Sequence, residues 1–326
     1  MTGKVGAGGE DRGLTGLFAV CLAGVIWGTI GPAVGLVHRW ADLSPWVISA
    51  YRAVSAVAAL LVMTVVTRRV ASTWSAAKQQ WRRVVVVGLL TASFQLLFFI
   101  AVIAAGVSVT TVVCLGFAPV LLLVLGCVRD RRLPAAGPAL TVSTAVVGLL
   151  LVSLVGSTGA PPPHPVLGIL AALASGSAYA LSAEVAKPLS HRIDSQTLTT
   201  ATICVAAAVL IPGGLLAGAL RGETLTTADP KSWLMIVYLG AVTMGLAYAM
   251  FYAGLRGMSS GSAMVATLIE PVTAVVIAVV VLHERLSVAG LIGCLLILSA
   301  IASLGRPPKK TPSEAEPEPP DPYPPL

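Results

Sequence analysis

Ten long apolar runs dominate this sequence, and each is long enough to cross a bilayer as a helix. A spanning helix needs roughly 20 predominantly apolar residues. Backbone polar groups find no water in lipid, so each run must satisfy its own hydrogen bonds as a helix. The predicted runs are 15–37, 46–67, 84–105, 110–128, 136–155, 166–187, 198–220, 233–255, 262–282 and 287–304. The predicted fold class is an all-α integral membrane protein with ten transmembrane helices.

The composition agrees with this prediction and excludes a soluble protein. Of the 326 residues, 56% are hydrophobic and only 11% are charged, whereas soluble domains carry about 25% charged residues. The net charge of +7 does not indicate nucleic-acid binding, because the basic residues lie in short loops between apolar runs. All five cysteines lie within or beside these runs, where they are expected to act as small apolar side chains.

The second half of the chain repeats the first at a constant separation of 152 positions. Gly16, Gly24, Gly88 and Pro119 recur as Gly168, Gly176, Gly240 and Pro271. A shared register over such a length indicates duplication of one unit. Each unit holds five runs, and an odd number of spans turns the second copy upside down. The sequence therefore predicts two inverted five-helix repeats, an arrangement typical of secondary transporters.

Lysine and arginine predict the orientation, because cytoplasmic loops carry an excess of them. With the N-terminus inside, sixteen of the 21 Lys and Arg residues fall on the inner side and four on the outer side, while Arg52 lies within a run. Both termini are then cytoplasmic, and the predicted location is the plasma (inner) membrane.

Four regions follow from this reading. A cytoplasmic N-terminal segment covers 1–14, the two repeats cover 15–155 and 166–304, and a tail covers 305–326. The tail is rich in Pro and Glu and is predicted to be disordered.

Several segments resemble EamA-type transporters of the drug/metabolite transporter superfamily. The stretch Leu268–Ile301 resembles the closing part of that family, with Pro271 early in the ninth helix and Glu284–Arg285–Leu286 at its end. The stretch Gly24–Pro32 resembles the first helix, and "SPWVISAYRAVSA" resembles the second, with Arg52 at the family's arginine. The resemblance covers about residues 16–304.

The sequence departs from the family in two places. His283 stands where Gly commonly precedes the Glu, and Cys204 stands where the repeat would place a second copy of Arg52. The resemblance implies movement of small metabolites, often outward and without ATP.

Prolines within the runs predict helix breaks near a binding site. Proline removes one backbone N–H and frees a carbonyl four residues earlier, which in a membrane must face protein or a water-filled cavity. Pro119 and Pro271 are repeat mates, and Pro32 lies in the first run. A purely structural kink is the alternative for each. In the first run, Gly24-x-x-x-Gly28 and Gly31-x-x-x-Gly35 predict close helix packing.

Glu270 and Arg52 are ionisable groups within runs, where charge is costly and usually functional. Glu270 directly precedes Pro271 and is a candidate proton-coupling or cation-binding carboxylate; the alternative is a structural carboxylate bonded to Thr267 or Thr273. Arg52 is expected to snorkel to the surface, to pair with a carboxylate such as Glu270, or to bind an anionic group of the substrate. Glu184 is expected to pair with Lys187, three residues later on the same helical face.

Aromatic and amide groups complete the predicted cavity lining. Trp27 and Tyr179 are repeat mates, and Gln95 and Tyr248 are polar groups at membrane depth. Ordinary packing is the alternative for the aromatic residues. Together these residues offer an amphipathic lining suited to small metabolites.

The predicted function is secondary active transport of small organic metabolites, namely amino acids, amines, carboxylates or drug-like compounds. Efflux by alternating access with proton or substrate exchange is expected. No nucleotide-binding, hydrolytic or metal-ligand spacing is present, so no enzyme activity, cofactor or metal is expected. Expected partners are a small-molecule substrate and the bilayer, with protons and a second copy of the chain as candidates. An intramembrane enzyme acting on a lipid-linked substrate and a non-transporting scaffold are the alternatives.

Overall fold

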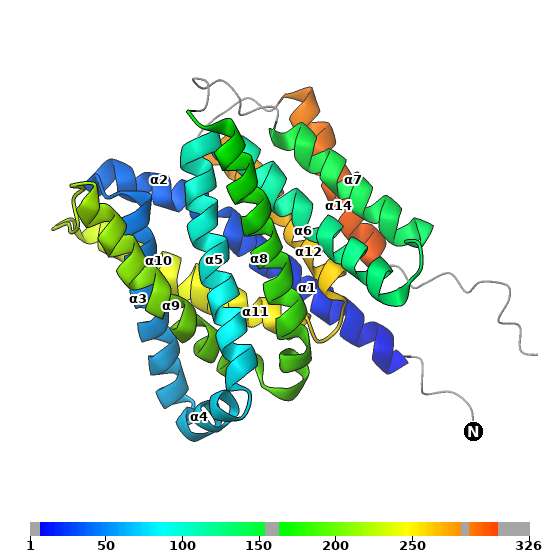
Figure 1. Ribbon diagram of the computed structural model, residues 1–326, viewed down its shortest axis with the longest axis horizontal. Coiled ribbons are helices and arrows are strands. Elements are labelled where there is room, and N and C mark those ends of the chain that lie inside the picture. Colours follow the sequence, from blue (N-terminus) through cyan, green and yellow to red (C-terminus); the bar gives the residue numbers. More distant parts are fainter. Residues whose placement is uncertain (1–6, 154–162, 282–286, 306–326) are drawn as a thin grey trace, which may run out of the picture.

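The computed structural model describes residues 7–153, 163–281 and 287–305, and these residues form helices joined by short connections (Figure 1). The Glu284–Arg285–Leu286 motif, His283 and the tail at 306–326 lie outside the described residues. Within the described part, nine helical segments are long and apolar enough to cross a membrane. The predicted all-α membrane protein is therefore confirmed.

The first half contains seven helices. They are α1 (Ala7–Gly28), α2 (Ile30–Ala41), α3 (Pro45–Val66), α4 (Val70–Gln79), α5 (Trp81–Ala105), α6 (Val107–Asp130) and α7 (Ala136–Ser153). Together, α1 and α2 form one candidate span, Gly13–Ala41. Helix α1 begins at Ala7, so the helix already starts within the predicted N-terminal segment. Helix α4 was not predicted, because it is too short and too polar to register as an apolar run.

The second half contains α8 (Pro165–Arg192), α9 (Ser195–Leu220), α10 (Pro230–Gly240), the π-helix η2 (Ala241–Leu246), α11 (Ala247–Gly254), α12 (Ser260–Thr267), α13 (Ile269–Val281) and α14 (Val288–Leu304). The segment from α10 to α11 forms one candidate span, and α12 with α13 contributes another. Helix α14 is apolar but shorter than the nine.

Helix starts follow local chemistry. Ser44, Asp194, Asp229, Ser259 and Ser287 each cap a helix with a side-chain oxygen that accepts a backbone N–H of the first turn. Such caps satisfy donors that the helix itself leaves unpaired. Pro45, Pro165 and Pro230 occupy first helical positions, where the missing N–H costs nothing.

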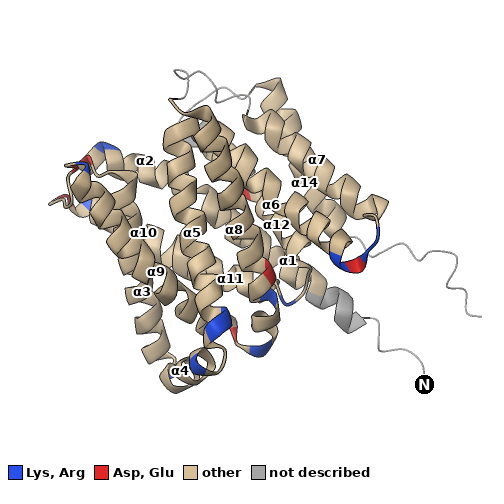
Figure 2. Ribbon diagram, viewed as in Figure 1, with Lys and Arg blue, Asp and Glu red and all other residues tan. Residues whose placement is uncertain are grey.

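The helices pack in crossed pairs between the two halves. Helix α5 packs along α8, α3 packs along α9, and α7 packs along α14, while α1 packs against η2, α11, α12 and α13. Lys and Arg gather towards the end of the bundle that carries α4 and the α6–α7 connection, and the middle stretches of the helices carry few charges (Figure 2). The core is thus built largely of contacts between helices that are distant in sequence.

Candidate functional site

Three candidate spans lose regular α-helical geometry partway along their length. Helices α1 and α2 are separated at Thr29, α12 and α13 are separated at Leu268, and η2 interrupts the span from α10 to α11. At the first two interruptions the chain makes tighter turns, from Thr29 N to Ile26 O and from Leu268 N to Val265 O. Interruptions of this kind expose backbone polar groups and are frequent at functional sites.

Two of the three predicted prolines account for these interruptions. Pro32 and Pro271 are each the third residue of the helix that follows the break. Neither can donate to the carbonyl four residues earlier, so the preceding helix cannot continue smoothly. The break predicted at Pro119 is wrong, because α6 runs continuously from Val107 to Asp130 with Pro119 inside it. Loss of a single ladder hydrogen bond is tolerated there.

The three interruptions meet around the end of α1. The Trp27 indole Nε1 donates to the Thr243 carbonyl in η2 at 2.8 Å. A Cβ placed on Gly28 would lie 2.6 Å from the Glu270 carbonyl and 2.5 Å from the Thr273 Cβ. On the next residue, the Thr29 hydroxyl lies 2.7 Å from the Tyr238 hydroxyl of α10. We call this region, which comprises Trp27–Thr29, Ala241–Leu246 and Thr267–Glu270, the broken-helix junction.

The glycines of the first span differ in their surroundings. A Cβ on Gly24 would come within 3.2 Å of the Thr267 carbonyl, and Gly28 is still more tightly enclosed. The first predicted close-packing motif therefore contacts α12 and α13. The second is wrong, because a Cβ on Gly31 or Gly35 would meet nothing within 4 Å.

Aromatic rings form a cluster beside the junction. The Trp27 ring lies 5.2 Å from Tyr248 and 6.5 Å from its repeat mate Tyr179, measured between centroids. Tyr179 stacks on Phe94 at 4.8 Å. Trp27, Tyr179 and Tyr248 are all buried, so the structure brings these three predicted site residues together.

Arg52 and Gln95 form a buried polar pair next to this cluster. The Arg52 Nη2 donates to the Gln95 Oε1 at 3.1 Å, and the two residues are only 8% and 6% exposed. The Arg52 Nε and the Gln95 Nε2 have no hydrogen-bond partner among the described residues. Buried donors are nearly always paired in proteins, so these two N–H groups remain available to an acceptor.

The position of Arg52 decides between the alternatives for this residue. Its burial excludes snorkelling to the surface, and the described residues show no ion pair between Arg52 and Glu270. Its hydrogen-bond partner is the Gln95 amide, which the sequence did not suggest. Arg52 nevertheless interacts electrostatically with Glu270 across the interior.

Glu270 lies in the first turn of α13, immediately after the break at Leu268. The first N–H groups of a helix lack intrahelical partners and carry partial positive charge, which favours a carboxylate there. The side chain is partly accessible, and it interacts electrostatically with Tyr179, Tyr248 and Cys114 as well as with Arg52. All six residues predicted for the site therefore belong to one region of the interior.

A large hollow opens at the end of the bundle that bears most of the Lys and Arg residues. It has a volume of about 1130 Å³ and lies between α6, α7, α8, α12 and α14. Pro119 and Val265 line it towards the middle of the bundle, and Arg129, Glu184 and Lys187 line it near the surface. Pro119 thus helps to shape a cavity although it does not break its helix.

The pairing predicted for Glu184 is wrong. Its carboxylate lies 4.0 Å from the Arg129 Nη1 of α6 and accepts a hydrogen bond from the Ser260 hydroxyl of α12. Lys187 forms no ion pair with it among the described residues. Since Ser260 is the first residue of α12, this contact joins the start of α12 to α8 at the rim of the hollow.

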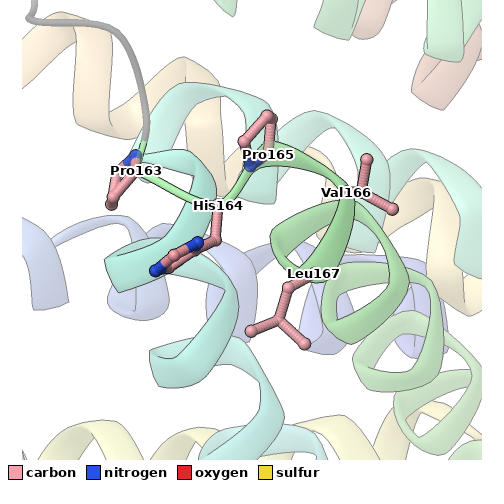
Figure 3. A pocket seen from close by; sticks show the side chains of 5 residues that line it. All are labelled: Pro163, His164, Pro165, Val166 and Leu167. Carbon is pink, nitrogen blue, oxygen red and sulfur yellow. The ribbon is translucent and has the colours of Figure 1, made fainter.

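A second hollow, of about 390 Å³, is lined by the consecutive residues Pro163–Leu167 (Figure 3). It borders residues outside the described ranges and holds none of the predicted site residues. Among the residues that the structure describes, no group of three His, Cys, Asp or Glu side chains could hold a metal ion.

Sequence reasoning missed several partners at the junction. The Thr243 carbonyl, the Tyr238 hydroxyl and the η2 segment carry no pattern that distinguishes them from ordinary helical residues. Gly240 and Gly245 flank or lie within η2 and are the one local signal of irregular backbone, because glycine weakens a helix.

Comparisons with known proteins agree with this architecture. Residues 166–306 match the EamA-like transporter family. The chain is 25% identical over 292 residues to "Uncharacterized transporter YwfM" of Bacillus subtilis (strain 168), covering 89% of this chain and 94% of that protein. A crystal structure with 20% sequence identity matches 90% of this chain and 96% of its own with a TM-score of 0.73, which shows a shared fold. The second half of the chain is thus similar to EamA-like transporters, and nearly the whole chain is similar to a protein named as a transporter.

Proposed function

We propose that this transporter moves small organic metabolites by alternating access, with the broken-helix junction as the substrate and coupling site. The observation that carries the proposal is the meeting of three interrupted spans at Glu270, beside the buried Arg52–Gln95 pair. Interrupted helices that meet within the membrane are the usual construction of transporter binding sites. Arg52 and Gln95 have N–H groups suited to a carboxylate or other acceptor, and the aromatic rings offer an apolar wall.

We assign proton coupling to Glu270. It is partly accessible, close to the breaks and in electrostatic contact with Arg52. A carboxylate that exchanges protons in step with substrate binding links the solute flux to a proton gradient. Exchange of one substrate for another remains the alternative drive, and pH-independent counter-transport would identify it.

The two repeats, 15–155 and 166–304, supply the moving halves in this proposal. Close approaches in one half have equivalents in the other: a Cβ on Gly88 would lie 2.7 Å from the Thr202 carbonyl, and a Cβ on its mate Gly240 would lie 2.5 Å from the Arg52 carbonyl. Helix α5 packs on α8. The repeat mate of α8 is α1, and the repeat mates of α5 are η2 and α11; α1 likewise packs on η2 and α11. These equivalences support a two-fold relation between inverted repeats.

The large hollow is the access route on the inner side in this proposal. Most Lys and Arg residues lie at its end of the bundle, which supports cytoplasmic termini in a plasma membrane. An opening on that side would admit solutes from the cytoplasm, and this favours transport out of the cell.

The test compares metabolites in the medium of cells that produce the parent chain, Glu270→Gln, or Glu223→Gln as a control in the loop between α9 and α10. We expect a small set of compounds to be enriched by the parent and by the control but not by Glu270→Gln. With each protein present and folded in the membrane, equal enrichment by all three would contradict the role of Glu270, and no enrichment by any of them would contradict efflux.

A further inference from the structure

Helix α4 lies between two membrane spans and has three distinct faces. It joins the end of α3 at Val66 to the start of α5 at Trp81, and none of its residues is buried. Helical geometry places Thr73, Ala76 and Ala77 on one side, and these residues are half-buried against the bundle. Val70 and Trp74 form a second, adjacent side, and Ser72, Ser75 and Gln79 form a third, polar side.

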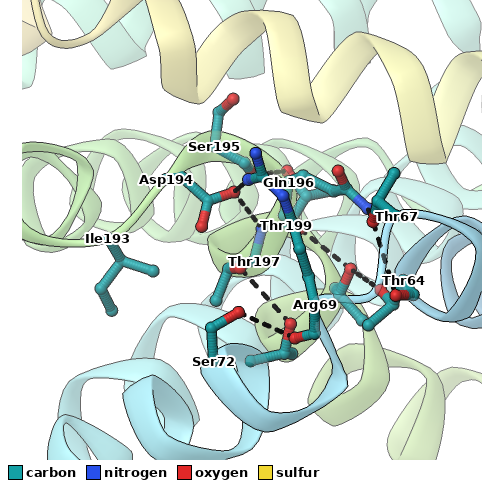
Figure 4. Close-up of polar contacts among 12 residues, drawn as sticks. Thr64, Thr67, Arg69, Ser72, Ile193, Asp194, Ser195, Gln196, Thr197 and Thr199 are labelled. Carbon is teal, nitrogen blue, oxygen red and sulfur yellow. Dashed lines mark hydrogen bonds and ion pairs between the residues drawn. The ribbon is translucent and has the colours of Figure 1, made fainter.

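Polar contacts hold α4 in place against α9. The Arg69 Nη1 lies 2.7 Å from the Asp194 Oδ1, and the Thr73 and Thr197 hydroxyls lie 3.4 Å apart (Figure 4). Beside them, the Gln196 amide donates to the Thr67 hydroxyl at 3.0 Å. The helix is therefore anchored to the bundle through one side, and this fixes the orientation of the second side, which Val70 and Trp74 form.

The second side is strongly apolar and open. Val70 is 54% exposed and Trp74 is 75% exposed, and Trp81 beyond the helix is 57% exposed. The last turn of α3 continues the same surface with exposed Val65 and Val66. That turn belongs to a candidate membrane span, so exposed apolar side chains continue along the chain from the end of α3 onto α4.

Basic residues lie close to this surface in the chain, and they have no acidic neighbours there. Arg68, Lys78, Arg82 and Arg83 are exposed, and the sequence contains no Asp or Glu between Asp42 and Asp130. Asp194 is engaged by Arg69. Four cations next to exposed tryptophan and valine match the surface of a membrane that contains anionic lipids. Each cation is attracted to the negatively charged headgroups, and the apolar side chains enter the boundary between headgroups and acyl chains.

We propose that α4 is an interfacial helix that binds the headgroups of anionic phospholipids, with Val70, Trp74 and Trp81 in the bilayer boundary and Arg68, Lys78, Arg82 and Arg83 on the lipid phosphates. The anchoring to α9 orients this contact. Because α9 packs along α3, lipid binding at α4 acts on a helix pair of the bundle core. This inference does not depend on the substrate, the direction of transport or the role of Glu270.

The first test measures lipid retention by native mass spectrometry. The full chain is released from nanodiscs of phosphatidylcholine mixed equally with phosphatidylglycerol. We expect the parent to retain phosphatidylglycerol preferentially, and a triple variant with Lys78→Gln, Arg82→Gln and Arg83→Gln to lose at least tenfold of this preference, since each cation near an anionic surface contributes about fivefold. The matched control carries Arg39→Gln, Arg221→Gln and Lys231→Gln and should behave as the parent. Equal preference in both triple variants would overturn the proposal.

The second test leaves all charges intact. Tryptophan fluorescence of the parent and of Trp74→Phe is compared in bilayers with brominated acyl chains and in the presence of aqueous acrylamide. Trp74 should contribute a component that brominated lipid quenches and acrylamide does not. A Trp74 component quenched by acrylamide alone would place α4 in water, where a soluble partner would be the ligand, and would overturn the proposal.

Discussion

At the scale of single residues, the interior is defined by a few polar groups whose partners lie far away in the sequence. Arg52 donates to Gln95 on α5 and not to a carboxylate, and Trp27 donates to the Thr243 carbonyl in the π-helix. The Arg52–Gln95 bond leaves the Arg52 Nε and the Gln95 Nε2 without a partner among the described residues. A buried guanidinium with one unpaired Nε is costly for stability alone, which supports the proposed role of Arg52 in binding substrate.

Arg52→Lys should raise the KM for an anionic substrate about tenfold or more. Lysine offers a point charge in place of the planar fork, so it cannot bond the Gln95 amide and a substrate carboxylate with the same geometry, and a hydrogen bond to a charged group contributes about 1.5–3 kcal/mol. Transport assays in vesicles would measure this change. Arg39→Lys, at the end of α2, is the control; an unchanged KM in Arg52→Lys would exclude bidentate recognition by Arg52.

At the scale of elements, short helices and helix ends carry the functional geometry. The breaks at Thr29 and Leu268 bring Gly28 against the Glu270 carbonyl, and Asp194 both caps α9 and anchors α4. Each of these contacts joins one element to another across the bundle. Their effects can be separated with substitutions at matched positions.

Gly28→Ala should destabilise the protein and Gly31→Ala should not. A Cβ at Gly28 would overlap Thr273 and the Glu270 carbonyl, whereas a Cβ at Gly31 would meet nothing within 4 Å. Overpacking typically costs about 1–3 kcal/mol, and alanine in an open helical site gains up to about 1 kcal/mol over glycine. Thermal unfolding of both variants in detergent would check this. Similar melting temperatures for the two variants would contradict the close approach of α1 and α13.

The contact between α4 and α9 should weaken in acid. Burial works to raise the pKa of Asp194, but hydrogen bonds from Thr197 and the charge of Arg69 outweigh it and hold this pKa below its ordinary value. A carboxyl with a lowered folded-state pKa stabilises the fold fully above its unfolded-state pKa, and loses that contribution as the pH falls through the folded-state pKa.

Asp194→Asn should therefore be less stable than the parent at neutral pH, by about 0.2–1 kcal/mol as for exposed ion pairs. Asparagine retains the helix cap, so the difference in stability between the two proteins measures the contribution of the Asp194 charge. Unfolding curves at neutral pH and below the ordinary aspartate pKa of about 3.9 would measure it. A difference that persists unchanged in acid would show that the charge of Asp194 is not its source.

At the scale of the whole molecule, the distribution of charge and the large hollow give the bundle two unlike ends. The hollow lies at the end with most Lys and Arg residues, and the loop between α9 and α10 lies at the other. A large opening at one end is the arrangement expected of one state in an alternating-access cycle.

Cysteine labelling should distinguish these ends. In a background without the five native cysteines, Ser262→Cys in the hollow should react with a membrane-impermeant maleimide only in inverted vesicles. Thr226→Cys in the α9–α10 loop should react only in intact cells. Reaction of Ser262→Cys in intact cells would reverse the proposed orientation of the chain.

The limits and helical nature of most spans could be predicted because they depend on local hydropathy, although the described residues hold nine spans of full length where ten were predicted. The run predicted at 46–67 is the helix Pro45–Val66, and the one at 198–220 is Ser195–Leu220. Two of the three helix breaks could also be predicted from the sequence, because Pro32 and Pro271 each leave a carbonyl of their own segment without its N–H donor. The family resemblance rested on the same segments.

The sequence by itself therefore determined that this chain is an all-helical membrane protein with polar groups at membrane depth. Tertiary structure alone decided which of those groups meet: Arg52 with Gln95, Glu184 with Arg129 and Ser260, and Trp27 with Thr243. Hydropathy and helix propensity depend on neighbours along the chain, whereas these pairings depend on distances between helices that only the packing of the whole bundle sets.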